Sequence, residues 1–359
     1  MCTRERREGW ERWLQQVQNS TDLQQLSRIR KQFHEDLSGE QRAVETLVEV
    51  EWINRIYDAM IEQTVKLSYG QLNEQGKGWP PVPFQFVLYG SGGRQELTLW
   101  SDQDNGIVYE TPPNGQEEEV QAYFLQLGEA VVAGLHEIGF PPCDGKVVSS
   151  EPMWCTTYAQ WADRMDAWIA DPNWEHIRYL LICLDARPLF TYGKVSFQLQ
   201  LPLDAYRHYD VTVLPHLVAN TLKHKMVLNI FGGLIPEPYG EDAGTIDIKY
   251  GCYIPIVNAI RLLAVAEGIA ESSTRQRFWK LRTSGTYPVV ELKKWEEAWI
   301  YFLELRNQVH AQYEQGVFAA SGKLRVERMT KEMKHTLKSH VRTGNALQKM
   351  IRRKIGSGG

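Results

Sequence analysis

The sequence predicts an α+β protein in which a small α/β unit lies between an N-terminal helical region and a C-terminal helical bundle. Apolar residues recur at helical spacing through roughly the first 70 residues. Short aromatic and β-branched runs bounded by glycine and proline begin near residue 84, and helical spacing returns after about residue 206. We therefore expect domains at 1–80, 81–200 and 201–355.

The N-terminal region, from Arg4 to about Gly70, is rich in Leu, Gln, Glu and Arg. The step Thr21-Asp22 is typical of a helix start, and four apolar residues follow it at helical spacing. They are Leu23, Leu26, Ile29 and Phe33. The run from Gln41 to Leu67 is long enough for a second, mostly buried helix. Because these helices could pair with a second copy of the chain, a homodimer is one expected assembly.

The middle region begins after the break GKGWPPVP and alternates short strands with helices. Phe84–Tyr89 is aromatic and β-branched, which is typical of a strand. The pattern also predicts strands at 105–110 and 146–150 and helices at 117–138, 158–170 and 175–184. These elements form a unit that ends near Gly193.

The last region is helical from Tyr206 onward, with interruptions at Gly232-Gly233 and in the polar loop 236–245. A helical bundle is the simplest arrangement for this pattern. The final residues, 356–359, are typical of a flexible tail.

Composition limits the partners of the chain. A net charge of −4 and an isoelectric point near 6.2 give it no overall positive field, although 323–354 is locally basic, so a nucleic-acid partner is not favoured. The five cysteines are scattered and lack CxxC spacing, which does not favour a disulfide framework or a zinc site. No stretch approaches the ~20 apolar residues of a membrane helix. We expect a cytoplasmic protein with no membrane partner.

The segment from Leu88 to Asn105, LYGSGGRQELTLWSDQDN, contains the candidate chemistry. Its glycines let the backbone turn tightly and approach a ligand, and the free N–H groups of the following helix start favour an anion such as a triphosphate. Ser91 can donate a hydrogen bond to a phosphate oxygen, and Arg94 can supply a fork-shaped cation to the same group. Gly90, Ser91 and Arg94 are therefore candidate nucleotide-binding residues.

Two aspartates, Asp102 and Asp104, begin the second strand of this segment. Residues two apart on a strand share one face, so their carboxylates can converge on Mg²⁺ or Mn²⁺. Two such metals could clamp an attacking oxygen, an α-phosphate and a triphosphate for in-line displacement of pyrophosphate.

Each part of this segment also has an ordinary structural explanation. A Gly-Ser turn is usually only a turn, and Asp-x-Asp at a strand end is often a solvated loop or a helix cap. The combination of strand, glycine turn, spacer, paired acids and second strand is much rarer, and it favours the functional interpretation. No Gly-Lys-Ser/Thr follows the turn, and the GxGxxG spacing is absent, so Walker and Rossmann loops are excluded here.

This segment resembles the signature of the nucleotidyltransferase superfamily that includes polymerase β, which is Gly-Ser, a spacer and then Asp-x-Asp. More narrowly, GSGGRQELTLWSDQDN resembles the longer signature of the nucleotidyltransferases related to the bacterial PII-protein uridylyltransferase. Further segments similar to that branch are Gly139–Trp154, Asp185–Leu189, Thr245–Gly251 with Pro255, and Arg261–Leu263. The resemblance covers about residues 20–350 and is strongest at 86–109.

The resemblance implies a mixed-sheet nucleotidyltransferase domain with helical regions before and after it, and it implies NTP and Mg²⁺ (or Mn²⁺) as ligands. Gly90 and Ser91 would hold the triphosphate, Arg94 would contact it, and Asp102 and Asp104 would hold the metals. The implied reaction is transfer of UMP or AMP to a protein side chain. A small-molecule acceptor is one alternative, and a degenerate module that senses NTP or metal is another.

The superfamily also has a third carboxylate on a later strand, but the strand expected at 146–150 contains no acid. Asp144, just before it, and Asp185, in an acid-x-Arg step, are the candidates, and Asp185 is preferred as a catalytic residue. A local cap by Asp185, or its pairing with Arg187, is the structural alternative, and either would weaken or abolish two-metal catalysis.

Overall fold

The computed structural model describes residues 4–39, 46–99, 101–199, 213–221, 227–229, 231–308, 311–314, 317–320 and 322–354. The chain divides into two compact units. Unit 1 comprises Met1–Met165, Asp185–Leu199 and Gln312–Ala319; unit 2 comprises Asp166–Leu184, Gln200–Ala311 and Ala320–Gly359. The α+β fold class is confirmed. The division at residues 80 and 200 stays a prediction.

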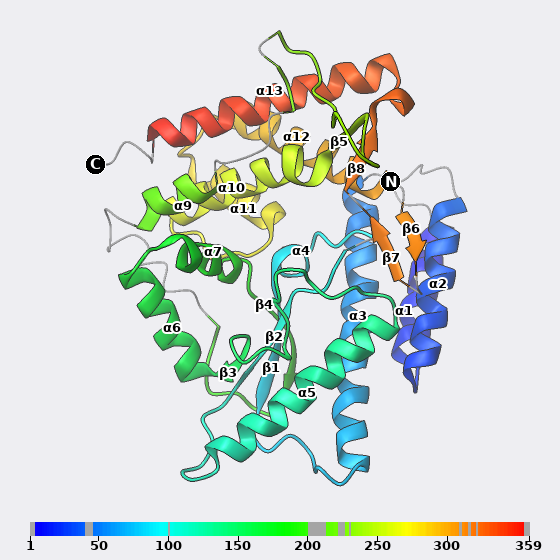
Figure 1. The fold of residues 1–359 in the computed structure, drawn as a ribbon, viewed down its shortest axis with the longest axis vertical. Coiled ribbons are helices and arrows are strands. Elements are labelled where there is room, and N and C mark those ends of the chain that lie inside the picture. Colours follow the sequence, from blue (N-terminus) through cyan, green and yellow to red (C-terminus); the bar gives the residue numbers. More distant parts are fainter. Residues whose placement is uncertain are drawn as a thin grey trace. The chain divides into compact units, whose positions relative to one another are not determined.

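Unit 1 contains a mixed four-stranded sheet in the order β3-β2-β1-β4 (Figure 1). Its strands are β1 (Phe84–Leu88), β2 (Asn105–Tyr109), β3 (Cys155–Thr157) and β4 (Arg187–Tyr192). Strand β1 is antiparallel to both β2 and β4, and β2 is parallel to β3. Leu88 lies opposite Asn105 on one side and Arg187 on the other, so the end of β1 adjoins the beginnings of β2 and β4.

Unit 1 also contains helices. They are α1 (Arg4–Gln18), α2 (Leu23–Gly39), α3 (Thr46–Glu74), the single turn α4 (Gly90–Gly93) and α5 (Glu117–Glu137). Figure 1 shows the long helix α3 and helix α5 beside the sheet, and the two helices pack against each other. One buried cluster joins both helices to alternate residues of the strands, as period-2 side-chain placement requires. Its members include Ile53, Tyr57, Ile61, Phe84, Phe86, Leu88, Ile107, Tyr109, Phe124, Leu127 and Val131.

Several details of this unit differ from the sequence prediction. The strand expected at 146–150 is wrong, because Lys146 has a left-handed φ of 54° and the following residues turn. The backbone N–H of Ser149 donates to the Asn105 side chain at 2.8 Å instead of joining a ladder. Strand β3 lies later, at Cys155–Thr157, and β4 was not predicted. Strands β6 (Ala311–Glu314) and β7 (Val317–Ala320) pair in a separate two-stranded sheet.

The helix α6 (Tyr158–Ala170) crosses from unit 1 into unit 2, which is mainly helical. The helices of unit 2 are α7 (Trp174–Cys183), α9 (Val213–Thr221), α10 (Ile254–Ala266), α11 (Thr274–Ser284), α12 (Val289–Gln308) and α13 (Lys331–Lys354). Smaller elements are β5 (Thr245–Asp247), the π-helical turn η1 (Lys249–Tyr253), β8 (Lys323–Arg325) and the 3-10 turn η2 (Val326–Arg328). Helix α10 is almost entirely buried, with α9, α11 and α13 against it. The predicted helical bundle is therefore present in the described residues.

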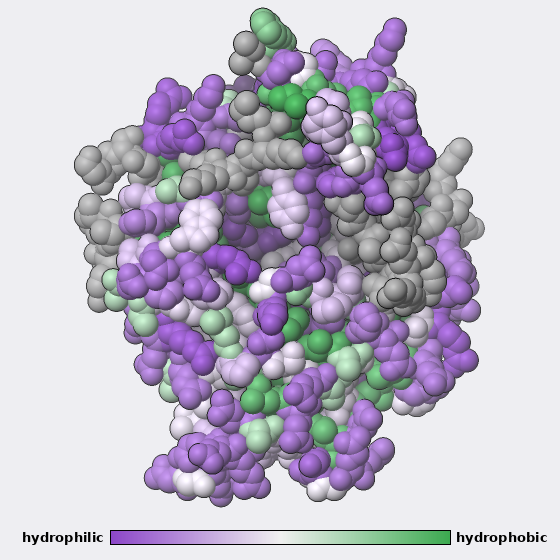
Figure 2. Space-filling model, viewed as in Figure 1, coloured by the Kyte–Doolittle hydropathy of each residue, from purple (hydrophilic) through white to green (hydrophobic). Residues whose placement is uncertain are grey.

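Hydrophilic residues cover most of the face shown in Figure 2, and hydrophobic residues lie there in small groups. Among the helices of the described residues, none combines the length and apolar composition needed to span a bilayer.

Candidate functional site

Three predicted site segments meet at one edge of the unit 1 sheet. The glycine turn α4 follows the end of β1, Asp102 and Asp104 precede β2, and Asp185 precedes β4. Because β1 runs antiparallel to both neighbours, its end and their beginnings lie at the same edge. The topology therefore brings together residues that are up to about a hundred positions apart in the sequence.

Gly90 and Asp104 contact each other directly across the β1–β2 pair. Gly90 has a φ of +50°, a conformation that glycine adopts without strain. A Cβ atom at this position would collide with the Asp104 carboxylate. The Tyr89 N–H donates to the Asp104 carbonyl at 3.0 Å, which fixes the spacing of the two segments. Glycine at 90 thus allows the turn with Ser91 to lie against the carboxylate.

The two aspartates share one face of the segment that enters β2. Asp102 and Asp104 are partly exposed, whereas Gln103 and Asn105 between and after them are buried. The Gln103 amide donates to the carbonyls of Val132 and Phe140 at 3.3 and 3.2 Å. Asn105 donates to the Gln103 side chain at 3.2 Å. The amides therefore anchor this segment to the core and turn both carboxylates to the other side.

The oxygen ligands at this edge fit a hard divalent cation that takes some of its ligands from the protein and the others from a substrate and from water. In the part of the chain that the structure describes, no three His, Cys, Asp or Glu side chains converge to hold a metal by themselves. Mg²⁺ does not need such a cage, because it commonly keeps several waters and takes one or two carboxylates plus substrate phosphates. Asp102 and Asp104 can supply that pair, while Asp144 lies exposed in a turn.

Arg94 and Asp185 form a buried ion pair beneath the glycine turn. Arg94 Nη1 lies 2.6 Å from Asp185 Oδ2, and Arg94 Nε lies 2.8 Å from Glu96 Oε2. Arg94, Glu96 and Asp185 are exposed by only 4%, 2% and 1%. Such a pair is costly to break, because removing one member leaves a buried charge uncompensated. Arg94 is expected to contact phosphate, and Asp185 is expected to be the third carboxylate; both roles stay predictions. In this structure the two side chains pair with each other, and Arg94 pairs with Glu96 as well.

The alternative pairing of Asp185 with Arg187 is wrong. Arg187 instead donates to Asp58 on α3 at 2.8 Å and to the Gly92 carbonyl at 2.9 Å. Burial raises the pKa of Asp58, and the Arg187 guanidinium opposes that shift. Helix α3 therefore supports the glycine turn through an arginine at the start of β4.

Helices α2 and α3 also hold the spacer between the glycine turn and the aspartates. The Asn54 side chain accepts from the Leu97 N–H at 2.9 Å and donates to the Leu97 carbonyl at 3.2 Å. The Leu99 carbonyl accepts from Tyr57 at 3.3 Å and from Arg30 at 3.4 Å. These positioning residues are not predictable from the sequence, because a polar residue in a buried helix has no local signature of its distant partner.

Cys143 lies beside Asp104. Burial, followed by the charge of Asp104 and a hydrogen bond to it, raises the pKa of the Cys143 thiol to about 12. The thiol therefore stays protonated at neutral pH and is a poor nucleophile there.

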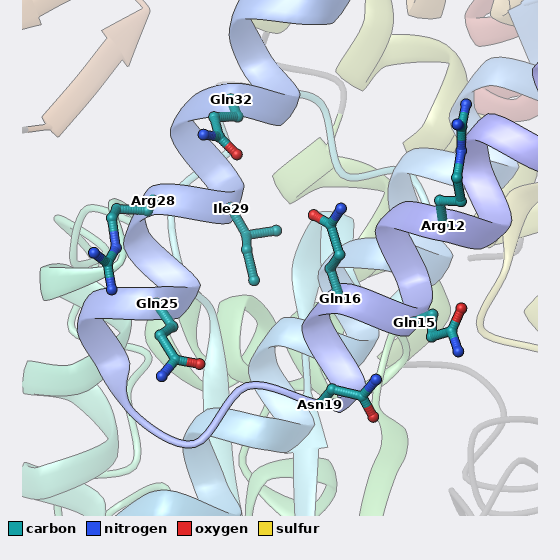
Figure 3. A pocket seen from close by; sticks show the side chains of 8 residues that line it. All are labelled: Arg12, Gln15, Gln16, Asn19, Gln25, Arg28, Ile29 and Gln32. Carbon is teal, nitrogen blue, oxygen red and sulfur yellow. The ribbon is translucent and has the colours of Figure 1, made fainter.

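The described residues of unit 1 line two cavities. An open one of about 530 Å³ lies on α1 and α2, where Figure 3 shows the lining side chains. They are Arg12, Gln15, Gln16, Asn19, Gln25, Arg28, Ile29 and Gln32, and they include none of the predicted site residues. A second cavity of about 10 Å³ is lined in part by Gly92, Asp102 and Asp104. It has room for about one water, so it cannot hold a nucleotide.

Comparison with known protein families gives two matches. Residues 28–175, which include the glycine turn and both aspartates, match the family described as "Putative nucleotidyltransferase DUF294". Residues 212–355 match the family described as "Putative nucleotidyltransferase substrate binding domain". A search of curated proteins found no relative that matches the chain.

Proposed function

Because these two matches show that the chain is related to the nucleotidyltransferases, we propose that it transfers UMP or AMP from an NTP to a protein side chain. The observation that supports this proposal most is the contact between Gly90 and the Asp104 carboxylate. It puts the expected phosphate-binding turn directly beside an expected metal ligand.

In the proposed reaction, the backbone at Gly90 and the Ser91 hydroxyl bind the triphosphate. Asp102 and Asp104 would hold Mg²⁺ or Mn²⁺, which would stabilise the charge that develops on the phosphoryl oxygens. The acceptor hydroxyl forms the new P–O bond at the α-phosphorus and loses its proton to water, while the α–β P–O bond breaks and pyrophosphate leaves. Gln103 and Asn105 keep both carboxylates turned toward this space.

In this proposal Asp185 and Arg94 belong to the same site. The Arg94 guanidinium lies 2.6 Å from the buried Asp185 carboxylate, the proposed third acid, and compensates its charge. The backbone of Asp185 also adjoins the glycine turn, since Gly93 packs so closely on the Asp185 carbonyl that a Cβ atom there would collide with it.

One observation favours a second candidate, a degenerate module that binds NTP or metal without transfer. Asp185 Oδ2 is engaged by Arg94 Nη1, and among the described residues no group of three His, Cys, Asp or Glu side chains could hold a metal ion. A site with weakened metal binding could still hold a nucleotide at the glycine turn.

The two candidates are separated by incubating the purified chain with each α-labelled NTP and Mg²⁺ or Mn²⁺ in cell lysate. Label should move to a protein acceptor with the native chain and not with Asp102→Asn or Asp104→Asn. Asp163→Asn, an exposed aspartate of α6 in the same unit, is the matched control and should transfer normally. Binding of NTP and metal without any transfer by the native chain would reject the enzyme and leave the sensor. Equal transfer by all variants would reject the assigned metal ligands.

A further inference from the structure

Arg306 is an unusual buried cation in unit 2. It lies in the last turns of α12, it is only 8% exposed, and its neighbours Phe302, Leu303 and Leu305 are buried apolar residues. Its guanidinium carbon lies 4.2 Å from the centroid of the Tyr253 ring, so the guanidinium stacks on an aromatic face.

The Nη1 atom of Arg306 is enclosed and has no hydrogen-bond acceptor among the described residues. Other buried arginines of the described chain each donate to an acceptor. Arg30 donates to the carbonyls of Ile138 and Leu99, Arg94 to Glu96 and Asp185, Arg261 to Asn258, and Arg277 to the carbonyls of Glu271 and Leu184. Arg306 departs from this pattern.

The stacking on Tyr253 does not compensate for the missing acceptor. Arginine stays protonated at any physiological pH, so burial cannot neutralise it. A ring face attracts the flat side of the guanidinium, whereas the N–H groups point outward in its plane and still need acceptors. Buried polar groups without a partner are rare, and a missing ligand is one common reason for them. An oxyanion is the ligand whose geometry matches the arginine fork.

The turn η1, whose Tyr253 contacts Arg306, gives a second indication of function. Tyr253 ends the π-helical turn η1, and such turns are rare and often lie at functional sites. Lys249 begins the same turn, with its ammonium 5.3 Å from the Tyr250 ring centroid. The Asp247 carboxylate accepts the Tyr250 N–H at 2.7 Å and so fixes the start of the turn. Two cationic side chains therefore lie on or against one irregular turn.

We propose that Arg306, stacked on Tyr253, is an anion-binding site that takes a phosphate or carboxylate group of a substrate. That the anion belongs to a substrate rests on the proposed function and on the match of 212–355 to a substrate-binding domain. The anion itself follows from the unsatisfied buried guanidinium alone. The group comes either from the nucleotide or from an acidic acceptor.

The test measures anion binding to the whole chain by calorimetry, without divalent metal, so that it does not depend on transfer. The probes are pyrophosphate, an NTP and L-glutamate, which separate a phosphate source from a carboxylate source. The affinity for at least one probe should fall tenfold or more in Arg306→Met, which keeps an apolar stem for packing. Arg328→Met, an exposed arginine of η2, is the matched control and should bind normally.

Arg306→Lys keeps the charge but loses the fork, and its affinity should fall several-fold even if Arg306→Met folds poorly. Unchanged affinity of both Arg306 variants for every probe would overturn the proposal. The double variant Asp102→Asn, Asp104→Asn should keep the Arg306-dependent binding. Absence of transfer by the native chain, with this binding retained, would reject the proposed function and leave the anion site in place.

Discussion

Gly90 has both a left-handed backbone and a carboxylate where a Cβ atom would lie, and these two constraints can be separated experimentally. Gly115 has a similar positive φ of +83° but open space around it. We predict that Gly115→Ala lowers the free energy of unfolding by about 1 kcal/mol, the usual strain of a non-glycine residue in this region. Gly90→Ala should lower it further and reduce nucleotidyl transfer by about a hundredfold or more, because Asp104 must move.

Urea unfolding and transfer assays on both variants check this prediction. The two glycines should differ most in activity, since Gly115 lies far along the chain from the glycine turn. Equal effects of the two substitutions would show that the Asp104 contact does not matter.

His34 makes the stability of unit 1 depend on pH. It is 1% exposed, and its Nε2 atom lies 2.5 Å from the Tyr57 hydroxyl. Burial, and then the charge of Arg30, lower the pKa of His34 to about 2. The folded state therefore keeps His34 neutral, while the unfolded chain protonates it below about pH 6.5. Its contribution to stability is complete above pH 6.5 and is lost progressively as the pH falls toward the folded pKa.

We predict that unfolding free energy falls between pH 7 and pH 5 by about 2 kcal/mol more in the native chain than in His34→Leu, at ~1.4 kcal/mol per pH unit below 6.5. Urea unfolding at a series of pH values measures the free energy of unfolding of each chain. The contributions of the other titrating groups cancel in the difference between the two chains. Parallel profiles for the two chains would contradict a neutral buried His34.

At the scale of elements, α3 holds the loop that carries the aspartates. Asn54 makes two hydrogen bonds to the Leu97 backbone, and both partners are buried. Asn54→Ala leaves a buried N–H and a buried carbonyl unsatisfied, so we predict a loss of about 3 kcal/mol in unfolding free energy. If the chain transfers as proposed, kcat should fall at least about tenfold, with a smaller change in KM, because the loop and not the nucleotide contact is disturbed.

Gln63→Ala is the control for this prediction. Gln63 lies on the same helix, and its amide donates to the Ser20 carbonyl at 2.7 Å, away from the loop. The Gln63→Ala substitution should lower the free energy of unfolding by about 1 kcal/mol and leave kcat unchanged. A similar fall in kcat for both variants would mean that general loosening of α3, and not the Leu97 contact, affects the site.

The elements that the sequence predicts well are those with a complete local pattern. The helices expected at 117–138, 158–170 and 175–184 match α5, α6 and α7 to within a residue, and the first two strands match β1 and β2. Strand β4 is not predicted from the sequence, because it contains Pro188 and pairs through a shifted register. Both features disturb the alternation expected of a strand. The expected strand at 146–150 has a suitable composition, but its backbone turns at Lys146.

The candidate site is predictable only in part for a similar reason. The glycine turn and the aspartate pair lie within one short motif, so their proximity follows from two adjacent strands. The partners of Arg94 and Leu97 are set by tertiary contacts, with Asp185 91 residues away and Asn54 43 residues away. The periodicity of a sequence does not predict contacts between such distant residues. For the same reason it does not predict that Arg306 lacks a hydrogen-bond acceptor.

At the scale of the whole molecule, the two units are not continuous segments. The chain passes from one to the other several times, and Asp166–Leu184, with α7, clusters with the C-terminal helices. Ile177 and Leu180 of α7 are buried, α7 packs on α9, and the Leu184 carbonyl accepts from Arg277 at 2.6 Å. A fragment that begins at residue 201, the predicted domain boundary, loses this helix and leaves Arg277 with one fewer acceptor.

We predict that fragment 201–355 unfolds at a temperature about 10 °C or more below that of fragment 166–355. Each lost buried apolar side chain is worth about 1.5–3 kcal/mol, and each kcal/mol shifts the midpoint by roughly 2–4 °C at this size. Circular dichroism during heating measures both midpoints, and near-ultraviolet spectra show whether the tryptophans are packed. Equal midpoints would place the boundary at 200, whereas a large difference would assign α7 to the C-terminal unit on energetic grounds as well as by its contacts.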